Sequence, residues 1–325
     1  MNVLIIGYGA IGKERAKALL RLNKDMGTDD IKVYVRDLEP IENLPDGVFN
    51  VEDDTFKDEA PDWVFICTSH HVMRDWLSVV CTWGSKILVE KPFGRHYLES
   101  LDMYNMLPKP EDVYVGFNYR FFPAVALLAR DLSEGRLGNI ISMNMVLGHG
   151  GSPEDASSWK LDPILGARSA LLDPGIHFLD LITLFFTEIT PISYCATRGF
   201  WATGIDEEVH ALLNGDYSII SIQASVVKWR STFRIEVNGD DGYAIIEGKG
   251  KSYGDQIYTT GTRWGWKSTS LPQRETEEQS WCGDCSDSFY EETKSLLTHK
   301  ATNCTASHAL KVMSMYQEII INDNN

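Results

Sequence analysis

The sequence predicts an α/β protein with a doubly wound parallel sheet over residues 1–118 and, over residues 119–325, an α/β domain with a large, mostly antiparallel open sheet. Three observations support this prediction. The chain of 325 residues is longer than a single hydrophobic core usually grows. In the first part, short apolar runs alternate with helical stretches, which is typical of βαβ units. In the second part, strand-like runs follow one another with few helices between them.

The expected elements of the first domain alternate regularly. An apolar run enters a glycine-rich turn at residues 7–12, and the stretch that follows has the spacing of a helix. The strands that we expect are residues 2–6, 31–36, 62–68, 85–90 and 112–117.

The second domain begins with a helix near residues 123–134. A further helix is expected at residues 173–186, DPGIHFLDLITLFF, where Asp173 would cap the helix and Pro174 would take its first position. The expected strands are residues 141–147, 192–201, 207–213, 217–229, 232–237 and 243–248. Tight turns are expected at Asn214-Gly215 and within residues 238–242.

The helix at residues 173–186 carries polar residues in an otherwise apolar run. Asp173 and His177 are four residues apart and Asp180 is three further on, so all three would lie along one stripe of the helix. A histidine here is either a hydrogen-bonded core residue or part of a site.

The composition excludes several classes of partner. Thirty lysine and arginine residues against 46 aspartate and glutamate residues give a net charge of −16. We therefore expect no nucleic acid and no anionic membrane as partner.

No apolar run reaches the ~18 residues that span a bilayer, and the N-terminus lacks the pattern of a secretory leader, so we expect a cytoplasmic protein. Cys282 and Cys285 have no second ligand pair at zinc spacing, so we expect no metal.

The glycine turn is the first chemical motif. Three glycines at this spacing permit a tight turn, close approach of a pyrophosphate and close packing of the helix, whose N-terminus offers N–H donors. The residues expected to bind a dinucleotide here are Gly7, Tyr8, Gly9, Ala10, Ile11 and Gly12.

The second expected strand ends beside an acidic residue. Asp37 is placed to bind the adenosine ribose, which favours NAD, whereas Arg36 before it could accept the 2′-phosphate of NADP. We expect NAD and leave NADP open.

Further motifs reveal a family resemblance. VEKPFG at residues 89–94, VGFNYRFFP at 115–123, GRLGNI at 135–140 and DPGIHFLD at 173–180 follow the glycine turn in order. The chain resembles the glucose–fructose oxidoreductase and inositol dehydrogenase family (Gfo/Idh/MocA) over nearly its whole length. The resemblance implies a Rossmann domain, an open-sheet domain, and a substrate held between that sheet and a nicotinamide.

The resemblance also implies catalytic residues. Lys91 matches the lysine of the Glu-Lys-Pro motif, and Asp173 and His177 match the acid and the histidine of the second motif. Further cofactor contacts would come from Thr68, Ser69, Glu90 and Lys91. Further substrate contacts would come from Asn118, Arg120, Trp159 and Arg168, together with Asp173 and His177.

Two segments depart from the family pattern. The loop after the strand expected at residues 62–68 reads TSHHVM, with Ser69 in place of a proline. We expect the adjacent His70 and His71 to be loop residues. Arg168 stands in place of a small residue before the DPGIH helix, where it would contact a substrate carboxylate or phosphate, or form a structural ion pair.

These residues favour a hydride-transferring enzyme that acts on a secondary alcohol or ketone of a sugar, polyol, sugar acid or nucleotide-linked sugar. Two alternatives stay open: an NAD-dependent glycosidase that oxidises its sugar transiently, and a cofactor-sensing protein without turnover. The apolar run at residues 217–229 suggests that the sheet is covered on both faces. We therefore expect a homodimer or homotetramer.

Overall fold

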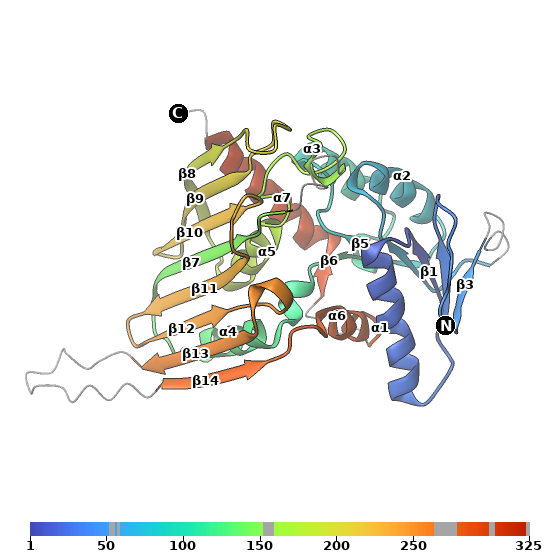
Figure 1. Ribbon diagram of the computed structural model, residues 1–325, viewed down its shortest axis with the longest axis horizontal. Helices are drawn as coiled ribbons and strands as arrows, with labels where there is room; N and C mark the ends of the chain where they lie inside the picture. Colours follow the sequence, from blue (N-terminus) through green and yellow to red (C-terminus); the bar gives the residue numbers. More distant parts are fainter. Residues whose placement is uncertain (52–55, 57–58, 152–158, 263–277, 299–302, 323–325) are drawn as a thin grey trace, which may run out of the picture. The chain divides into compact units, whose positions relative to one another are not determined.

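The computed structural model describes residues 1–51, 56, 59–151, 159–262, 278–298 and 303–322 (Figure 1). The chain forms two compact units. Unit 1 comprises Met1–Asn118, Trp159–Ala167 and Ser288–Met315. Unit 2 comprises Tyr119–Ser158, Arg168–Asp287 and Tyr316–Asn325. Two segments that follow residue 118 in the sequence thus belong to unit 1.

Unit 1 is built on a seven-stranded sheet in the order β15-β6-β5-β4-β1-β2-β3. All neighbours are parallel except β15, which runs antiparallel to β6. The strands are β1 (Asn2–Ile6), β2 (Lys32–Arg36), β3 (Val48–Asn50), β4 (Trp63–Ile66), β5 (Lys86–Glu90), β6 (Val113–Gly116) and β15 (Cys304–Thr305). The helices are α1 (Ala10–Met26), α2 (His70–Val80), α3 (Tyr97–Asn105), α6 (Ser288–Leu297) and the part of α7 (Ala306–Ile321) up to Met315.

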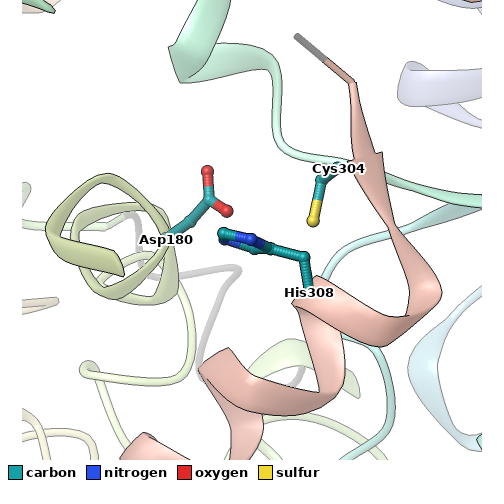
Figure 2. Close-up of side chains that lie close together, drawn as sticks. All are labelled: Asp180, Cys304 and His308. Atoms are coloured by element: carbon teal, nitrogen blue, oxygen red, sulfur yellow. The ribbon is translucent and has the colours of Figure 1, made fainter. Parts of the chain in front are cut away.

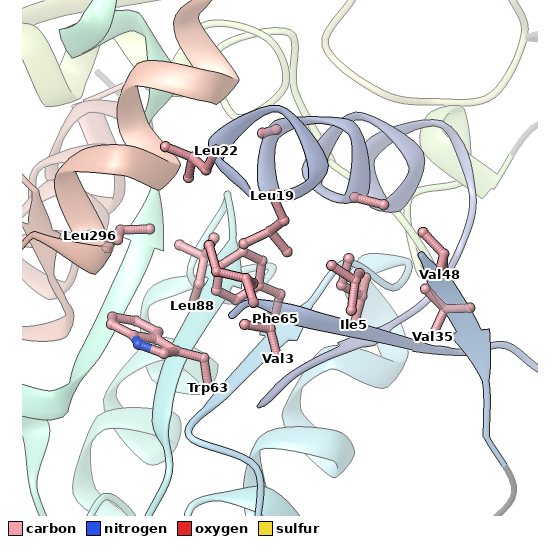
Figure 3. Packing of buried hydrophobic residues seen from close by; sticks show 14 of the residues in the cluster. Val3, Ile5, Leu19, Leu22, Val35, Val48, Trp63, Phe65, Leu88 and Leu296 are labelled. Atoms are coloured by element: carbon pink, nitrogen blue, oxygen red, sulfur yellow. The ribbon is translucent and has the colours of Figure 1, made fainter. Parts of the chain in front are cut away.

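The core of unit 1 covers both faces of this sheet. Val3 and Ile5 of β1 pack with Leu19 of α1 and belong to the same buried cluster as Leu296 of α6 (Figure 3). Leu4 alternates with them and is also buried, so it faces the opposite side of the sheet. Burying an aliphatic side chain of this size contributes about 1.5–3 kcal/mol. The predicted doubly wound parallel sheet is confirmed.

Unit 2 contains an eight-stranded sheet in the order β14-β13-β12-β11-β7-β10-β9-β8. Only the β7–β10 pair is parallel among the pairs described. The strands are β7 (Ile140–Gly148), β8 (Ile189–Thr197), β9 (Glu208–Gly215), β10 (Ser218–Ser225), β11 (Thr232–Gly239), β12 (Gly242–Glu247), β13 (Gln256–Thr262) and β14 (Glu278–Gly283). The predicted, mostly antiparallel sheet is confirmed.

Two helices cover one face of this sheet, α4 (Pro123–Ser133) and α5 (Ile176–Phe185). The ring of Phe178 in α5 lies 5.6 Å from that of Phe233 in β11, and the hydroxyl of Tyr258 in β13 donates to Asp131 of α4 at 2.6 Å. Short 3-10 helices lie at Pro110–Asp112, Asn118–Phe121, Trp159–Leu161 and Lys251–Tyr253. Among the residues that the structure describes, none of the helices combines the length and apolarity of a membrane span.

The predicted turn at Asn214-Gly215 is wrong by two residues. Both residues belong to β9, and Asp216 and Tyr217 form the turn with φ of 46° and 73°. The Asp216 carboxylate accepts the backbone N–H of Thr187 at 2.8 Å, which anchors the turn. Gly215 serves packing instead, because a Cβ there would lie 2.7 Å from Ile220 Cδ1. The turn predicted within residues 238–242 is confirmed.

The predicted start of the DPGIH helix is also wrong. Helix α5 begins at Ile176, and no side chain caps it. Backbone hydrogen bonds from Asp173 N to Ser169 O (3.1 Å) and from Gly175 N to Ala170 O (2.8 Å) hold the preceding residues in turns. Asp173 therefore precedes the helix and does not share a helical stripe with His177.

The prediction that His70 and His71 are loop residues is wrong as well. They form the first turn of α2, which Ser69 precedes as the N-cap. His70 is buried, and its ring meets that of Trp159 edge to face with centroids 4.8 Å apart.

Candidate active site

The glycine turn has the geometry that its sequence predicts. Gly7 has a φ of +92°, and a Cβ on it would lie 2.7 Å from the backbone oxygen of Cys67. A Cβ on Gly12 would lie 2.0 Å from Gly7 O, so only glycine permits this packing of α1 against the turn. A Cβ on Gly9 would meet no atom within 4 Å, and no side chain caps α1. Open space beside free helix N–H donors fits a pyrophosphate.

Asp37 lies beside this turn, directly after β2. The backbone N–H of Tyr8 donates to Asp37 Oδ2 at 2.5 Å, and the N–H of Glu39 donates to Oδ1 at 3.1 Å. A carboxylate has about four lone-pair sites, so two such bonds leave acceptor capacity for ribose hydroxyls. The guanidinium of Arg36 stacks 4.6 Å from the centroid of Trp76.

The loop after β4 supplies a second observation that fits a bound dinucleotide. The Thr68 hydroxyl is buried and has no hydrogen-bond partner among the described residues. Its backbone borders the glycine turn, because a Cβ on Gly7 would lie 2.9 Å from Thr68 N. Ser69 is the N-cap of α2 but makes no side-chain cap bond. An orphaned hydroxyl here is explained by a ligand that pairs with it.

Lys91 directly follows β5, at the carboxyl end of a central parallel strand. That edge of an open α/β sheet is where ligands bind. The preceding Glu90 has its carboxylate paired with Arg15, whose Nε donates to Oε1 at 2.7 Å. Glu90 therefore has a protein partner, whereas its sequence motif predicted a contact with the cofactor.

Two candidate substrate residues belong to unit 1. Trp159 packs against His70 in the first turn of α2. Asn118 is buried, and its Nδ2 donates to Ser288 Oγ at 3.0 Å.

In unit 2, His177 is held flat against a tyrosine. Its ring stacks on that of Tyr119 with centroids 3.8 Å apart and an angle of 7° between the planes. His177 is 4% exposed and Tyr119 is 6% exposed. Burial raises the pKa of Tyr119 well above its usual value, and Tyr253 and Asp173 raise it further. Asp173 therefore acts electrostatically on the same cluster as His177.

Three members of this cluster were not predicted from the sequence: Tyr119, Lys249 and Tyr253. The Lys249 ammonium lies 4.0 Å from the centroid of the Tyr253 ring and 5.4 Å from that of Tyr119. Burial, together with Asp173, raises the pKa of Tyr253 to about 12. Tyr119 lies within the VGFNYRFFP motif, whereas the other two lie in a turn whose glycines have positive φ. Only that glycine-rich pattern could have drawn attention to them.

Arg120 and Arg168 have different surroundings. Arg120 donates to Asp180 of α5 through Nε (2.7 Å) and Nη2 (2.5 Å), and both side chains are buried. Figure 2 shows Asp180 projecting from α5. Arg168 is exposed and lowers the pKa of the buried Tyr316 hydroxyl against the larger effect of burial.

Cys304 and His308 of unit 1 form a pair of potential metal ligands at the start of α7 (Figure 2). Their ligand atoms lie within 4.8 Å of each other. One thiol and one imidazole supply two of the four ligands of a structural zinc site. We therefore assign no metal to this pair. Cys282 is exposed and Cys285 is buried, and both are free thiols.

The decisive comparison is with family models, which match both parts of the chain. Residues 1–118 match the Gfo/Idh/MocA oxidoreductase family with an NAD-binding Rossmann fold, and residues 125–245 match the Gfo/Idh/MocA C-terminal domain. The chain belongs to the Gfo/Idh/MocA family.

Curated relatives of this family member are dehydrogenases. A levoglucosan dehydrogenase of Pseudarthrobacter phenanthrenivorans is 28% identical over 152 residues, which cover 42% of this chain and 39% of that protein. An inositol 2-dehydrogenase of Rhizobium meliloti is 28% identical over 266 residues, covering 75% of this chain and 74% of that protein.

A solved structure extends the likeness of this family member to its whole fold. A levoglucosan dehydrogenase in complex with NADH superposes with a TM-score of 0.80 at 18% identity, over 99% of this chain and 96% of that one. By contrast, the sequence match to the first curated relative spans less than half of that relative's length.

Proposed function

We propose that this protein is an NAD-dependent dehydrogenase or reductase that acts on a secondary hydroxyl or ketone of a carbohydrate. The observation that carries the proposal is the unit 2 cluster in which His177 stacks on Tyr119 and Asp173 acts electrostatically on Tyr119 and Tyr253. Several titratable groups converging on a buried histidine indicate a site. A histidine that only filled the core would need no such surroundings.

The chain's own residues can divide the chemistry between them. NAD, when bound, supplies the hydride acceptor. His177 takes the proton of the substrate hydroxyl. General-base catalysis of this kind accelerates a reaction by about 10²–10⁴-fold. The Lys91 ammonium stabilises the negative charge that develops on the substrate oxygen. Asp173 orients the imidazole or binds a neighbouring substrate hydroxyl.

The class of cofactor follows from unit 1 and from the relatives. Asp37 beside the glycine turn favours NAD, and the NADH in the similar levoglucosan dehydrogenase structure supports this choice. Arg36, beside Asp37, is able to pair with the 2′-phosphate of NADP, so binding of NADP is the alternative that the experiment tests. The levoglucosan and inositol dehydrogenases support a sugar or polyol substrate, with sugar acids and nucleotide-linked sugars as further classes.

We also propose that copies of this chain associate through the outer face of the unit 2 sheet. Ile219 of β10 and Ile192 of β8 are 46% and 49% exposed, whereas Ile220 and Ile222 are buried beneath. Ser221 on the outer face donates to Asn144 at 2.7 Å, so the face is mixed rather than apolar throughout. A homodimer or homotetramer would cover these isoleucines. The free cysteines fit the reducing cytoplasm.

A substrate panel tests the proposed activity. The purified protein is mixed with NAD or NADP and with a range of monosaccharides, inositols, sugar acids and nucleotide sugars, and NADH absorbance is followed. The proposal predicts net NADH formation with at least one substrate and a preference for NAD. Cleavage of a glycoside without net NADH would instead support a glycosidase. NADH binding without turnover on any substrate would support a sensing protein.

A further inference from the structure

Unit 1 contains a buried ionic cluster formed by Arg15 of α1, Glu90 of β5 and Glu292 of α6. Arg15 Nη2 lies 2.6 Å from Glu90 Oε1 and 2.6 Å from Glu292 Oε2. The side chains of Arg15, Glu90 and Glu292 are 0%, 10% and 3% exposed. One guanidinium therefore ties three elements together away from water.

The surrounding residues are shaped to fit this cluster. A Cβ on Gly116 of β6 would lie 2.7 Å from Glu90 Oε2 and 2.8 Å from Arg15 Nη2, so glycine leaves the space that the charges occupy. The Phe289 ring of α6 lies 4.8 Å from the Arg15 guanidinium. Helix α6 thus holds Arg15 with both an aromatic face and a carboxylate.

The charges of the cluster depend on one another. Burial disfavours the charge of Arg15, but Glu292 and Glu90 outweigh it and hold the pKa of the guanidinium above its usual range. Removing one partner leaves a buried charge uncompensated, which strongly disfavours the arrangement that the three side chains hold.

The cluster joins two parts of the proposed site. Arg15 lies on the helix that the glycine turn opens, and Glu90 immediately precedes Lys91. We propose that Arg15 and Glu292 are positioning residues, which hold the phosphate-binding turn and Lys91 at a fixed separation. Helix α6, from the C-terminal part of the chain, thereby takes part in cofactor binding. This inference rests on the proposed function.

A second contact between the same two helices provides a matched control. The Tyr290 hydroxyl of α6 donates to Asp25 of α1 at 2.6 Å, and Arg21 stacks on the Tyr290 ring at 4.1 Å. In the part of the chain that the structure describes, the Tyr290 side chain contacts Asp25, Arg21 and Lys294 and makes no hydrogen bond to Glu90. Tyr290→Phe therefore weakens the packing of α1 against α6 without touching the ionic cluster.

The experiment compares Glu292→Gln with Tyr290→Phe. The Kd for NADH is measured by fluorescence titration well below the melting temperature of each variant, with no substrate present. We expect Glu292→Gln to raise the Kd by about tenfold, the lower end of the loss seen when a residue that orients binding groups is removed, and Tyr290→Phe to leave it unchanged. An unchanged Kd in Glu292→Gln, or an equal rise in both variants, would overturn the positioning role.

Glu292→Asp keeps the charge but shortens the side chain by one methylene. It replaces Glu292→Gln as the test variant if the glutamine variant does not fold. It should raise the Kd above that of the parent, and a Kd equal to that of the parent would overturn the proposal. Because NADH binding needs no substrate, the two proposals can fail separately. If the Kd shifts as expected while no carbohydrate is oxidised, the proposed activity fails and the positioning role stands.

Discussion

Arg120 offers a direct test of whether a candidate residue contacts substrate or stabilises the fold. Its guanidinium makes two hydrogen bonds to Asp180, and the side chains of Arg120 and Asp180 are 6% and 0% exposed. Breaking a buried pair by removing one partner costs about 3–5 kcal/mol, because the other charge stays buried without compensation. Arg120→Met should therefore destabilise the protein by an amount of this order.

The assay is thermal unfolding of Arg120→Met, with two comparisons. The double variant Arg120→Met/Asp180→Leu removes both charges and should recover most of the lost stability. Arg74→Met removes an exposed ion pair with Asp102 and should leave the melting temperature almost unchanged. A stable Arg120→Met variant with a strongly raised substrate KM would refute this reasoning and make Arg120 a substrate contact.

Three further predictions concern the cofactor and the assembly. Asp37→Ala should narrow the preference for NAD over NADP in binding titrations, and an unchanged ratio would mean that Arg36 sets it. Gly9→Val should abolish NADH binding but leave the fold intact, because its side chain enters open space, and normal NADH affinity in this variant would contradict the prediction. Gly12→Ala should instead prevent folding, because its Cβ would lie 2.0 Å from Gly7 O. Light scattering at micromolar concentration should give a multiple of the 36.6 kDa chain mass, and a monomer mass would refute the proposed association.

The sequence predicted the elements whose signals are local. Short apolar runs located the central strands of both sheets, and the glycine spacing located the turn at residues 7–12. The errors arose where a local pattern resembles one structure while packing and backbone hydrogen bonds impose another. Gly215 resembles a turn residue but packs against Ile220, and the Asp-Pro pair before α5 resembles a cap but is held in backbone turns by Ser169 and Ala170.

The candidate site shows the same division. Lys91 and His177 lie in recognisable motifs, so their sequence neighbours were sufficient to propose them as site residues. Lys249 reaches the rings of Tyr119 and Tyr253 only in the folded chain. The pairing of Arg15 with Glu292 likewise joins segments from opposite ends of the sequence, and no local pattern reports it.

We propose that His177 is the catalytic base, and the variant that bears on this role without an intermediate step is His177→Asn. The substitution keeps a polar side chain of smaller size, and turnover at saturating substrate is measured together with the NADH Kd and the melting temperature. We expect turnover per folded molecule to fall by about 10²-fold or more while the NADH Kd stays unchanged. A variant with a lowered melting temperature but normal turnover would instead make His177 a residue of the core.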